Sequence, residues 1–316
     1  MTTWRHTLDR AGIADPALRE AYTAQRRLVT RFDRATFTGV RLLLPAELVP
    51  DVVAATAFMH HTDNLLDQDA DGGAARTAFT AWERRVRGAL ADGGGDRGGA
   101  GGDGDGDRLL RALAHTVARR PELGDVVAEY LVAAPADAGW RGFAAEADFQ
   151  AYVDAYSLPA FLLVARLLAP ATGYDGYRAA CRTFVEAAQR LDFLEDVAED
   201  LRAGRLGIPE DALARHGLSR DGLEHGAPAG DFAGLVREVA ATARRGLADS
   251  RPLIELVPAP HRPMTRALID LQGHRLRAAE RAGSALLQGP ARRPVAAALG
   301  TLAGAYASTL RRSPGA

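Results

Sequence analysis

The chain has 316 residues and a formal net charge of −1, from 39 basic and 40 acidic side chains. A chain so balanced lacks the excess positive charge that draws proteins to nucleic acid or to an anionic membrane surface. Its one cysteine, Cys181, excludes an intrachain disulfide and a zinc site built from cysteines, and its apolar neighbours favour a small core side chain.

Neither the N-terminal residues nor the longest apolar stretch of the sequence predicts a membrane segment. The first 15 residues carry charges and lack the apolar core of a secretory signal. The longest apolar stretch, residues 158–170, is interrupted by Arg166 and is typical of a buried core helix. We therefore expect a cytoplasmic protein with no integral membrane span.

Apolar residues recur at helical spacing along most of the chain, and no alternating strand pattern or internal repeat is visible. The predicted helices cover residues 17–37, 51–66, 74–90, 109–119, 123–133, 149–168, 178–202, 232–254, 263–287 and 294–310, with short ones at 209–213 and 219–223. This pattern predicts an all-α bundle, and nothing divides residues 1–316 into more than a single domain.

Two features interrupt the helical pattern. Residues 93–107 contain nine glycines and four aspartates, a composition that predicts a flexible surface loop. Pro159 falls inside the helix predicted for residues 149–168, where it must remove one backbone hydrogen bond and kink the chain.

Two acidic runs carry the candidate chemistry. In a helix over residues 178–202, Gln189, Asp192, Asp196 and Asp200 would lie within about 40° of one another. Aspartates repeat at the same four-residue spacing far upstream, in a run that begins at Asp63. Stacked carboxylates repel, so either both runs are solvated helix faces or a cation holds them together. An oxygen-only site suits Mg²⁺ bound to a diphosphate substrate.

These residues resemble the squalene/phytoene synthase family of all-α prenyl-diphosphate enzymes. The early DxxxD motif of that family corresponds to Asp63–Asp67, its late QxxNxxRDxxED motif to Gln189–Asp200, and its GRxYxP motif to Gly204–Pro209. Residues 36–45 are similar to an early family segment that ends in LLP. The resemblance implies the isoprenoid synthase fold, with a central active-site cavity.

The resemblance also implies roles for individual side chains. Mg²⁺ would be held by Asp63, Asp67, Asp192, Asp196 and Asp200. The diphosphate would be bound near Gln189 and Arg205. Apart from the resemblance, a basic cluster near the C-terminus either closes over the diphosphate or forms a solvated face; it consists of Arg275, Arg277, Arg281, Arg292 and Arg293. Aromatic candidates for a tunnel that protects the prenyl cation are Phe58, Tyr152, Tyr156, Phe161, Phe184 and Phe193.

Several positions depart from the family pattern. His60 and Glu195 replace family arginines, and Thr56 and Gly207 replace family tyrosines. These are positions that would hold a second diphosphate or pack a second prenyl chain, so one donor fits better than two. His60, Glu195 or Asp154 would then orient an acceptor or take up its proton.

We therefore predict an Mg²⁺-dependent prenyltransferase of secondary metabolism. It would ionise a prenyl diphosphate, farnesyl diphosphate being expected, and pass the cation to a non-prenyl small-molecule acceptor. The resemblance suggests the indole of a tryptophan-containing cyclic dipeptide as that acceptor. Head-to-head condensation of two prenyl diphosphates, terpene cyclisation and a non-catalytic partner subunit remain as alternatives.

Overall fold

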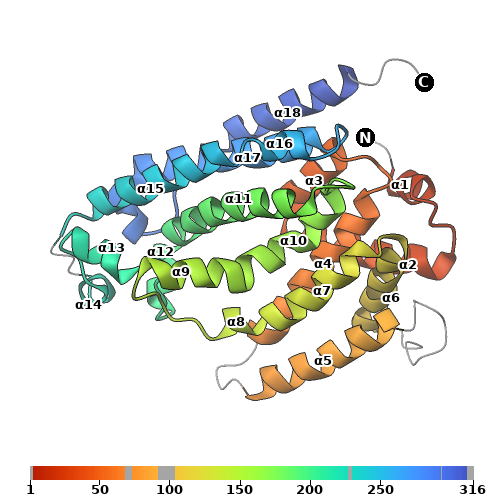
Figure 1. The fold of residues 1–316 in the computed structure, drawn as a ribbon, viewed down its shortest axis with the longest axis horizontal. Coiled ribbons are helices and arrows are strands. Elements are labelled where there is room, and N and C mark those ends of the chain that lie inside the picture. The colour runs from red at the N-terminus through yellow and green to blue at the C-terminus, as the bar shows by residue number, and fades with distance from the viewer. Residues whose placement is uncertain (1–2, 68–72, 92–103, 227–229, 293, 312–316) are drawn as a thin grey trace. The chain divides into compact units, whose positions relative to one another are not determined.

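The computed structural model describes residues 3–67, 73–91, 104–226, 230–292 and 294–311 (Figure 1). Helices dominate these residues, and the described ranges contain no strand, only an isolated parallel bridge between Gly142 and Leu206. The all-α fold class is therefore confirmed. The backbone forms two compact units, and whether they act as one domain stays a prediction.

The N-terminal unit comprises residues 1–138 together with 159–169. Its helices are α1 (Trp4–Arg10), α2 (Pro16–Phe32), α3 (Arg34–Leu43), α4 (Val49–Asp67), α5 (Gly73–Ala91), α6 (Asp105–Arg119), α7 (Glu122–Ala133), α8 (Pro135–Ala138) and most of α10 (Leu158–Leu168). Helix α2 packs against α3, α4 and α6, and α4 also packs against α5 and α6. Completely buried Phe58 and Tyr130 lie at the centre of this unit, in edge-to-face contact.

The single helix predicted for residues 17–37 is wrong, because the chain breaks at Asp33. Asp33 leaves the helical conformation, with φ −143° and ψ 87°, and its carboxylate accepts a hydrogen bond from the Thr36 backbone at 2.9 Å. Asp33 thus ends α2 and caps the N-terminus of α3, a role that aspartate favours.

The predicted flexible loop at residues 93–107 is also partly wrong. Its residues 93–103 lie outside the described ranges, but α6 begins at Asp105. Asp105 and Asp107 stand in the first turn, where negative charge stabilises the helix dipole, and Asp107 pairs with Arg85 at 2.5 Å. These aspartates start a helix instead of extending a loop.

The C-terminal unit comprises residues 139–158 and 170–316. Its helices are α9 (Glu146–Tyr152), α11 (Tyr174–Glu195), α12 (Val197–Arg202), α13 (Glu210–Arg215), α14 (Arg220–Glu224), α15 (Phe232–Asp249), α16 (Leu253–Leu256), α17 (Arg262–Ala282) and α18 (Val295–Arg311), with a 3₁₀ segment at Gly283–Leu287. Helix α11 packs along α15 and α17, and α18 covers α17 (Figure 1). Buried Cys181 lies on α11, as predicted.

Two predicted helices in this unit are shorter than expected. The helix predicted for residues 232–254 ends at Asp249 and restarts as α16 after Pro252. The helix predicted for residues 263–287 ends at Ala282, because Gly283 adopts φ +51°, a conformation that glycine permits.

A continuous helical run joins α9 to α10 through a π-helical turn, Val153–Ser157, which directly precedes Pro159. Proline has no N–H to donate, and here the Leu158 N–H bonds five residues back, to the Val153 carbonyl. The run 146–168 has the length and apolarity to cross a membrane, but 61% of its most apolar window is buried. That burial agrees with the prediction of a core helix, and the predicted cytoplasmic location stays a prediction.

Candidate active site

The late acidic motif lies where α11 ends and α12 begins. The prediction of one continuous helix over residues 178–202 is wrong, since Asp196 leaves helical geometry with φ −92° and ψ 3°. The spacing nevertheless survives the break. The Asp196 N–H bonds the Asp192 carbonyl and the Asp200 N–H bonds the Asp196 carbonyl, both at 2.9 Å. Asp192, Asp196 and Asp200 therefore still follow one another by one turn.

Gly204 reverses the chain immediately after α12. Its φ of +67° is the left-handed conformation of a helix-ending glycine. The Arg205 N–H then reaches back to the Asp200 carbonyl at 2.7 Å, and the Gly204 N–H bonds the Leu201 carbonyl at 3.1 Å. The Gly-Arg pair of the motif thus has a physical basis, because the glycine lets the chain bring Arg205 back beside Asp200.

Within the described part of the chain, the Arg205 guanidinium has a partner for some of its N–H donors but not for all of them. One nitrogen lies 3.4 Å from the Asp200 carboxylate, and the group stacks over the Trp140 ring, 5.3 Å from its centroid. Its Nε–H is buried and has no hydrogen-bond partner among the described residues. A buried donor of this kind is costly unless a ligand accepts from it, which suits the predicted role of Arg205 in binding a diphosphate oxygen.

Arg275 of α17 lies between two acidic side chains of α11. Its Nη2 bonds Asp192 at 2.6 Å and Glu195 at 2.5 Å, and its Nε bonds Glu195 at 3.0 Å. Burial raises the pKa of Asp192 and Arg275 opposes the rise. In the resembling motif QxxNxxRDxxED, Asp192 stands at the asparagine and Glu195 at the arginine. The two carboxylates that depart from this motif therefore share one basic partner, Arg275.

The charge around Asp200 fits a bound cation. Burial raises the pKa of Asp200, Arg205 counters this, and repulsion from Asp196 and Glu199 raises it further. Within the described ranges no three metal-ligating side chains are already gathered around one point. Asp196 and Asp200 offer oxygen donors only, the type of ligand that Mg²⁺ takes from proteins and from phosphate substrates.

The early motif belongs to α4 of the N-terminal unit. Asp63 accepts a hydrogen bond from the hydroxyl of Tyr130, a buried residue of α7. His60, one turn earlier, stacks on Phe32 with ring centroids 5.0 Å apart, and burial lowers its pKa so that the neutral ring is favoured. The side chain of Asp67 lies outside the described part of the chain. The predicted joint site of early and late aspartates stays a prediction, since they belong to different units.

The π-helical turn presents side chains to α11. Ser157 donates a hydrogen bond to the Gln189 side-chain oxygen at 3.0 Å. This fixes the orientation of the amide, whose nitrogen then points away from Ser157 as a donor for another group. Asp154, a candidate for orienting an acceptor, instead pairs with Arg182 at 2.8 Å.

An aromatic cluster lies beside the late motif. It consists of Trp140, Phe143, Phe149, Tyr152 and Phe193, with Tyr156 next to Tyr152 at 5.6 Å. Gly207 borders the cluster, and a Cβ built there would lie only 2.1–2.5 Å from Phe193. The glycine that replaces a family tyrosine therefore makes room for Phe193.

The remaining tunnel candidates separate from this group. Phe184 is buried on α11 at 2% exposure, whereas Phe58 and Phe161 belong to the N-terminal unit. Phe58 packs against Trp82 and Tyr130 in its core. The predicted aromatic lining thus contains one coherent cluster, around Tyr152, Tyr156 and Phe193.

Three side chains of these sites, Tyr130, Trp140 and Ser157, were not predicted from the sequence, and neither was the pairing of Arg275 with Asp192 and Glu195. Trp140 lies between the helices predicted for residues 123–133 and 149–168, and an isolated tryptophan before an aromatic-rich helix is a usable signal. The others contact their partners across 32 to 83 residues of sequence, and a single sequence contains no record of such contacts.

Comparisons with known proteins identify the family and the fold. The squalene/phytoene synthase family model matches residues 29–307. The bifunctional protein CrtB/UppS of Streptomyces coelicolor is 30% identical over 217 residues, which are 68% of this chain and 36% of that protein. The match thus spans about a third of that relative's length.

Solved structures show the same fold. The squalene synthase HpnC of Alicyclobacillus acidocaldarius superposes with a TM-score of 0.72 and 22% identity, over 89% of this chain and 99% of its own. A dehydrosqualene synthase superposes with a TM-score of 0.77 and 17% identity, over 93% of this chain and 98% of its own. YisP of Bacillus subtilis superposes with a TM-score of 0.66 and 16% identity, over 91% of this chain and 96% of its own. The family match, residues 29–307, covers most of the chain. The chain therefore belongs to the squalene/phytoene synthase family.

Proposed function

We propose that this prenyl transferase ionises one prenyl diphosphate, farnesyl diphosphate being the expected donor, and transfers the prenyl group to a non-prenyl acceptor. An electron-rich aromatic acceptor such as an indole suits the reaction, because its ring carbon can attack an allylic cation and then lose a proton. The observation that carries the proposal is the ion-pair arrangement of Arg275 with Asp192 and Glu195.

The charge around the late motif favours a single diphosphate. Asp192, Glu195, Asp196, Glu199 and Asp200 stand on α11, α12 and the break between them. Two basic groups of the same unit, Arg275 and Arg205, are already paired with acids of this motif, Arg275 with Asp192 and Glu195 and Arg205 with Asp200. A second diphosphate would bring further negative charge to a site where family arginine is replaced by Glu195, and this repulsion disfavours condensation of two donors.

The metal that we propose is Mg²⁺, held by Asp196 and Asp200 of the late motif, while the role of Asp63 and Asp67 as further ligands stays a prediction. When bound, it would neutralise the departing diphosphate. Arg205 would donate its unpaired Nε–H to a diphosphate oxygen, and the amide nitrogen of Gln189 would add a second donor. The aromatic cluster around Tyr152 and Phe193 would exclude water from the cation.

A second candidate is head-to-head condensation of two prenyl diphosphates. The names of the matched structures favour it, since they include a squalene synthase and a dehydrosqualene synthase. The site described here fits that reaction in its aspartates, Gln189 and Arg205. It differs at Glu195 and Gly207, where the resemblance places an arginine and a tyrosine.

The test is incubation with Mg²⁺ and farnesyl diphosphate, with and without a tryptophan-containing cyclic dipeptide, followed by pyrophosphate assay and mass spectrometry. A prenylated dipeptide that is lost in Asp196→Asn supports the proposal. Asp249→Asn is the matched control, because Asp249 is an exposed aspartate at the end of α15. A C30 hydrocarbon formed without the dipeptide would establish condensation instead, and a cyclised C15 product would establish a cyclase.

A further inference from the structure

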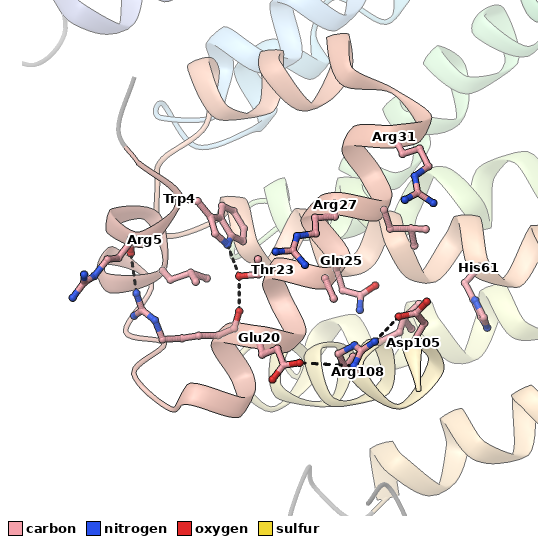
Figure 2. A pocket seen from close by; sticks show the side chains of 15 residues that line it. Trp4, Arg5, Glu20, Thr23, Gln25, Arg27, Arg31, His61, Asp105 and Arg108 are labelled. Carbon is pink, nitrogen blue, oxygen red and sulfur yellow. Dashed lines mark hydrogen bonds and ion pairs between the residues drawn. The ribbon is translucent and has the colours of Figure 1, made fainter. Parts of the chain in front are cut away.

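The N-terminal unit contains a cavity of about 770 Å³ bordered by α1, α2, α4 and α6 (Figure 2). Its only lining residue from α4 is His61. Two positions along a helix rotate the side chain by about 200°, so His61 lies about 160° around α4 from Asp63. This N-terminal cavity is therefore separate from the acidic face on which Asp63 stands.

Arginine dominates the charged lining of the N-terminal cavity. The arginines are Arg5, Arg19, Arg27, Arg31 and Arg108, against the acids Glu20 and Asp105. Arg19 pairs with Asp9 at 2.7 Å, and Arg108 pairs with Asp105 at 2.7 Å. The side chains of the other three have no ion pair or hydrogen bond within the described ranges. The cavity thus has an excess of uncompensated positive charge.

The three arginines without a partner among the described residues, Arg5, Arg27 and Arg31, have exposed side chains, so water solvates part of this charge and part of the repulsion remains. Arg27 and Arg31 stand four residues apart on α2, where like charges destabilise a helix. Burial lowers the pKa of neighbouring Arg26, and the charges of Arg27 and Arg41 lower it further. A bound anion would relieve this repulsion.

A second, independent observation is the side chain of Gln25. It lines the cavity, is only 3% exposed, and makes no hydrogen bond to any described residue. Figure 2 shows its amide directed into the space between Arg27 and Arg108. Buried amides are normally hydrogen-bonded, so this amide is a ready donor for a ligand at that point.

We propose that the N-terminal cavity is a binding site for a small organic phosphate, distinct from the candidate active site. Arg27 and Arg31 would hold the phosphate or diphosphate group, with Arg5 at the rim and the Gln25 amide inside. Leu8 and Leu28, which also line the cavity, would contact the organic part. The recessed position of Gln25 favours a free small molecule over a flat lipid surface.

The test uses inorganic pyrophosphate as the probe, in EDTA so that metal-dependent binding elsewhere is suppressed. The chain has three tryptophans, whose indole N–H signals report on separate places in an NMR spectrum. Trp4 lines the cavity and donates to Thr23 at 3.0 Å, whereas Trp140 stacks with Arg205. We expect a saturable shift of the Trp4 signal with no comparable shift of Trp140.

The variant Arg27→Gln/Arg31→Gln should weaken this binding by about tenfold or more, because it removes the charge-assisted contacts. Arg76→Gln/Arg84→Gln is the matched control, since both are exposed arginines of α5 outside the cavity, and it should bind as the parent does. The proposal is overturned if the Trp4 signal does not saturate, or if both double variants bind equally. It is also overturned if only phosphatidate-containing vesicles, and not pyrophosphate, bind through Arg27 and Arg31.

Discussion

Replacing Arg275 with glutamine tests the bridge on which the proposed function rests. Arg275 makes three short hydrogen bonds to Asp192 and Glu195, and without it these two carboxylates would repel one another on α11. The side chains of Arg275, Asp192 and Glu195 are 34%, 41% and 14% exposed, so solvent screens part of the interaction. We therefore expect Arg275→Gln to lower the free energy of unfolding by about 2 kcal/mol, below the 3–5 kcal/mol typical of breaking fully buried pairs.

Urea denaturation followed by circular dichroism would measure the loss, and a double-mutant cycle with Asp192→Asn would isolate the Arg275–Asp192 pair. The coupling should be about 1 kcal/mol at neutral pH. It should vanish as the pH falls through the raised pKa of Asp192, because the protonated acid no longer attracts Arg275. Arg244→Gln is the control, since its pair with Glu280 is more exposed and should contribute less than about 1 kcal/mol. If Arg275→Gln costs no more than Arg244→Gln, or if the cycle shows no coupling, the bridge does not organise this site.

Three further expectations concern the same unit. Gly207→Ala should lower the free energy of unfolding by about 1–3 kcal/mol, because the new Cβ would overlap Phe193. Adding Phe193→Leu should restore part of the lost stability. Gly176→Ala is the control in the same denaturation assay, because the space around Gly176 is open. Mg²⁺ at 100 times its dissociation constant should stabilise the protein by about 2.7 kcal/mol in thermal unfolding at neutral pH. This gain should be absent in Asp200→Asn and should fade as the pH falls through the raised pKa of Asp200, since only the ionised carboxylate binds the ion; a gain unchanged in the variant would remove Asp200 from the metal site. The Cys181 thiol, completely buried and with its pKa raised by burial to about 12, should react with a disulfide reagent only as fast as the protein unfolds.

The sequence predicted the fold because helical spacing is a local property. The acidic pair on α4 and the aspartates after Gln189 were placed on helices for the same reason, and the motif order led to the family. The Gly204-Arg205 turn was recognisable as a motif, although its hydrogen bonds to Asp200 needed the structure.

Breaks within charged helices were not predictable in the same way. No glycine or proline lies between residues 178 and 202, so nothing in the periodicity marks the interruption at Asp196. Asp33 is similar, because an aspartate inside a charged helical stretch is indistinguishable from a cap until its bond to Thr36 is known.

Long-range pairs were the other omission. Arg275 was identified as one of several basic residues that either contact a diphosphate or face solvent. The structure gives a third outcome, in which it neutralises Asp192 and Glu195. Electrostatic partners separated by 80 residues cannot be assigned from spacing, because the choice among the acidic side chains of α11 depends on how α17 packs against α11.

The π-helical turn at Val153–Ser157 acts as a one-residue insertion that the fold has kept. Gln150 and Asp154 before and within the turn both bind Arg182, at 2.7 and 2.8 Å, while Ser157 at its end binds Gln189. Deleting one residue there would restore regular α-helical winding and rotate the two sets of contacts by about 100° relative to each other. Only one set could then face α11. The number of residues in the turn should therefore be kept when this helix is shortened or grafted. A sequence alignment with a gap inside the turn would place the upstream side chains on the wrong face of the helix.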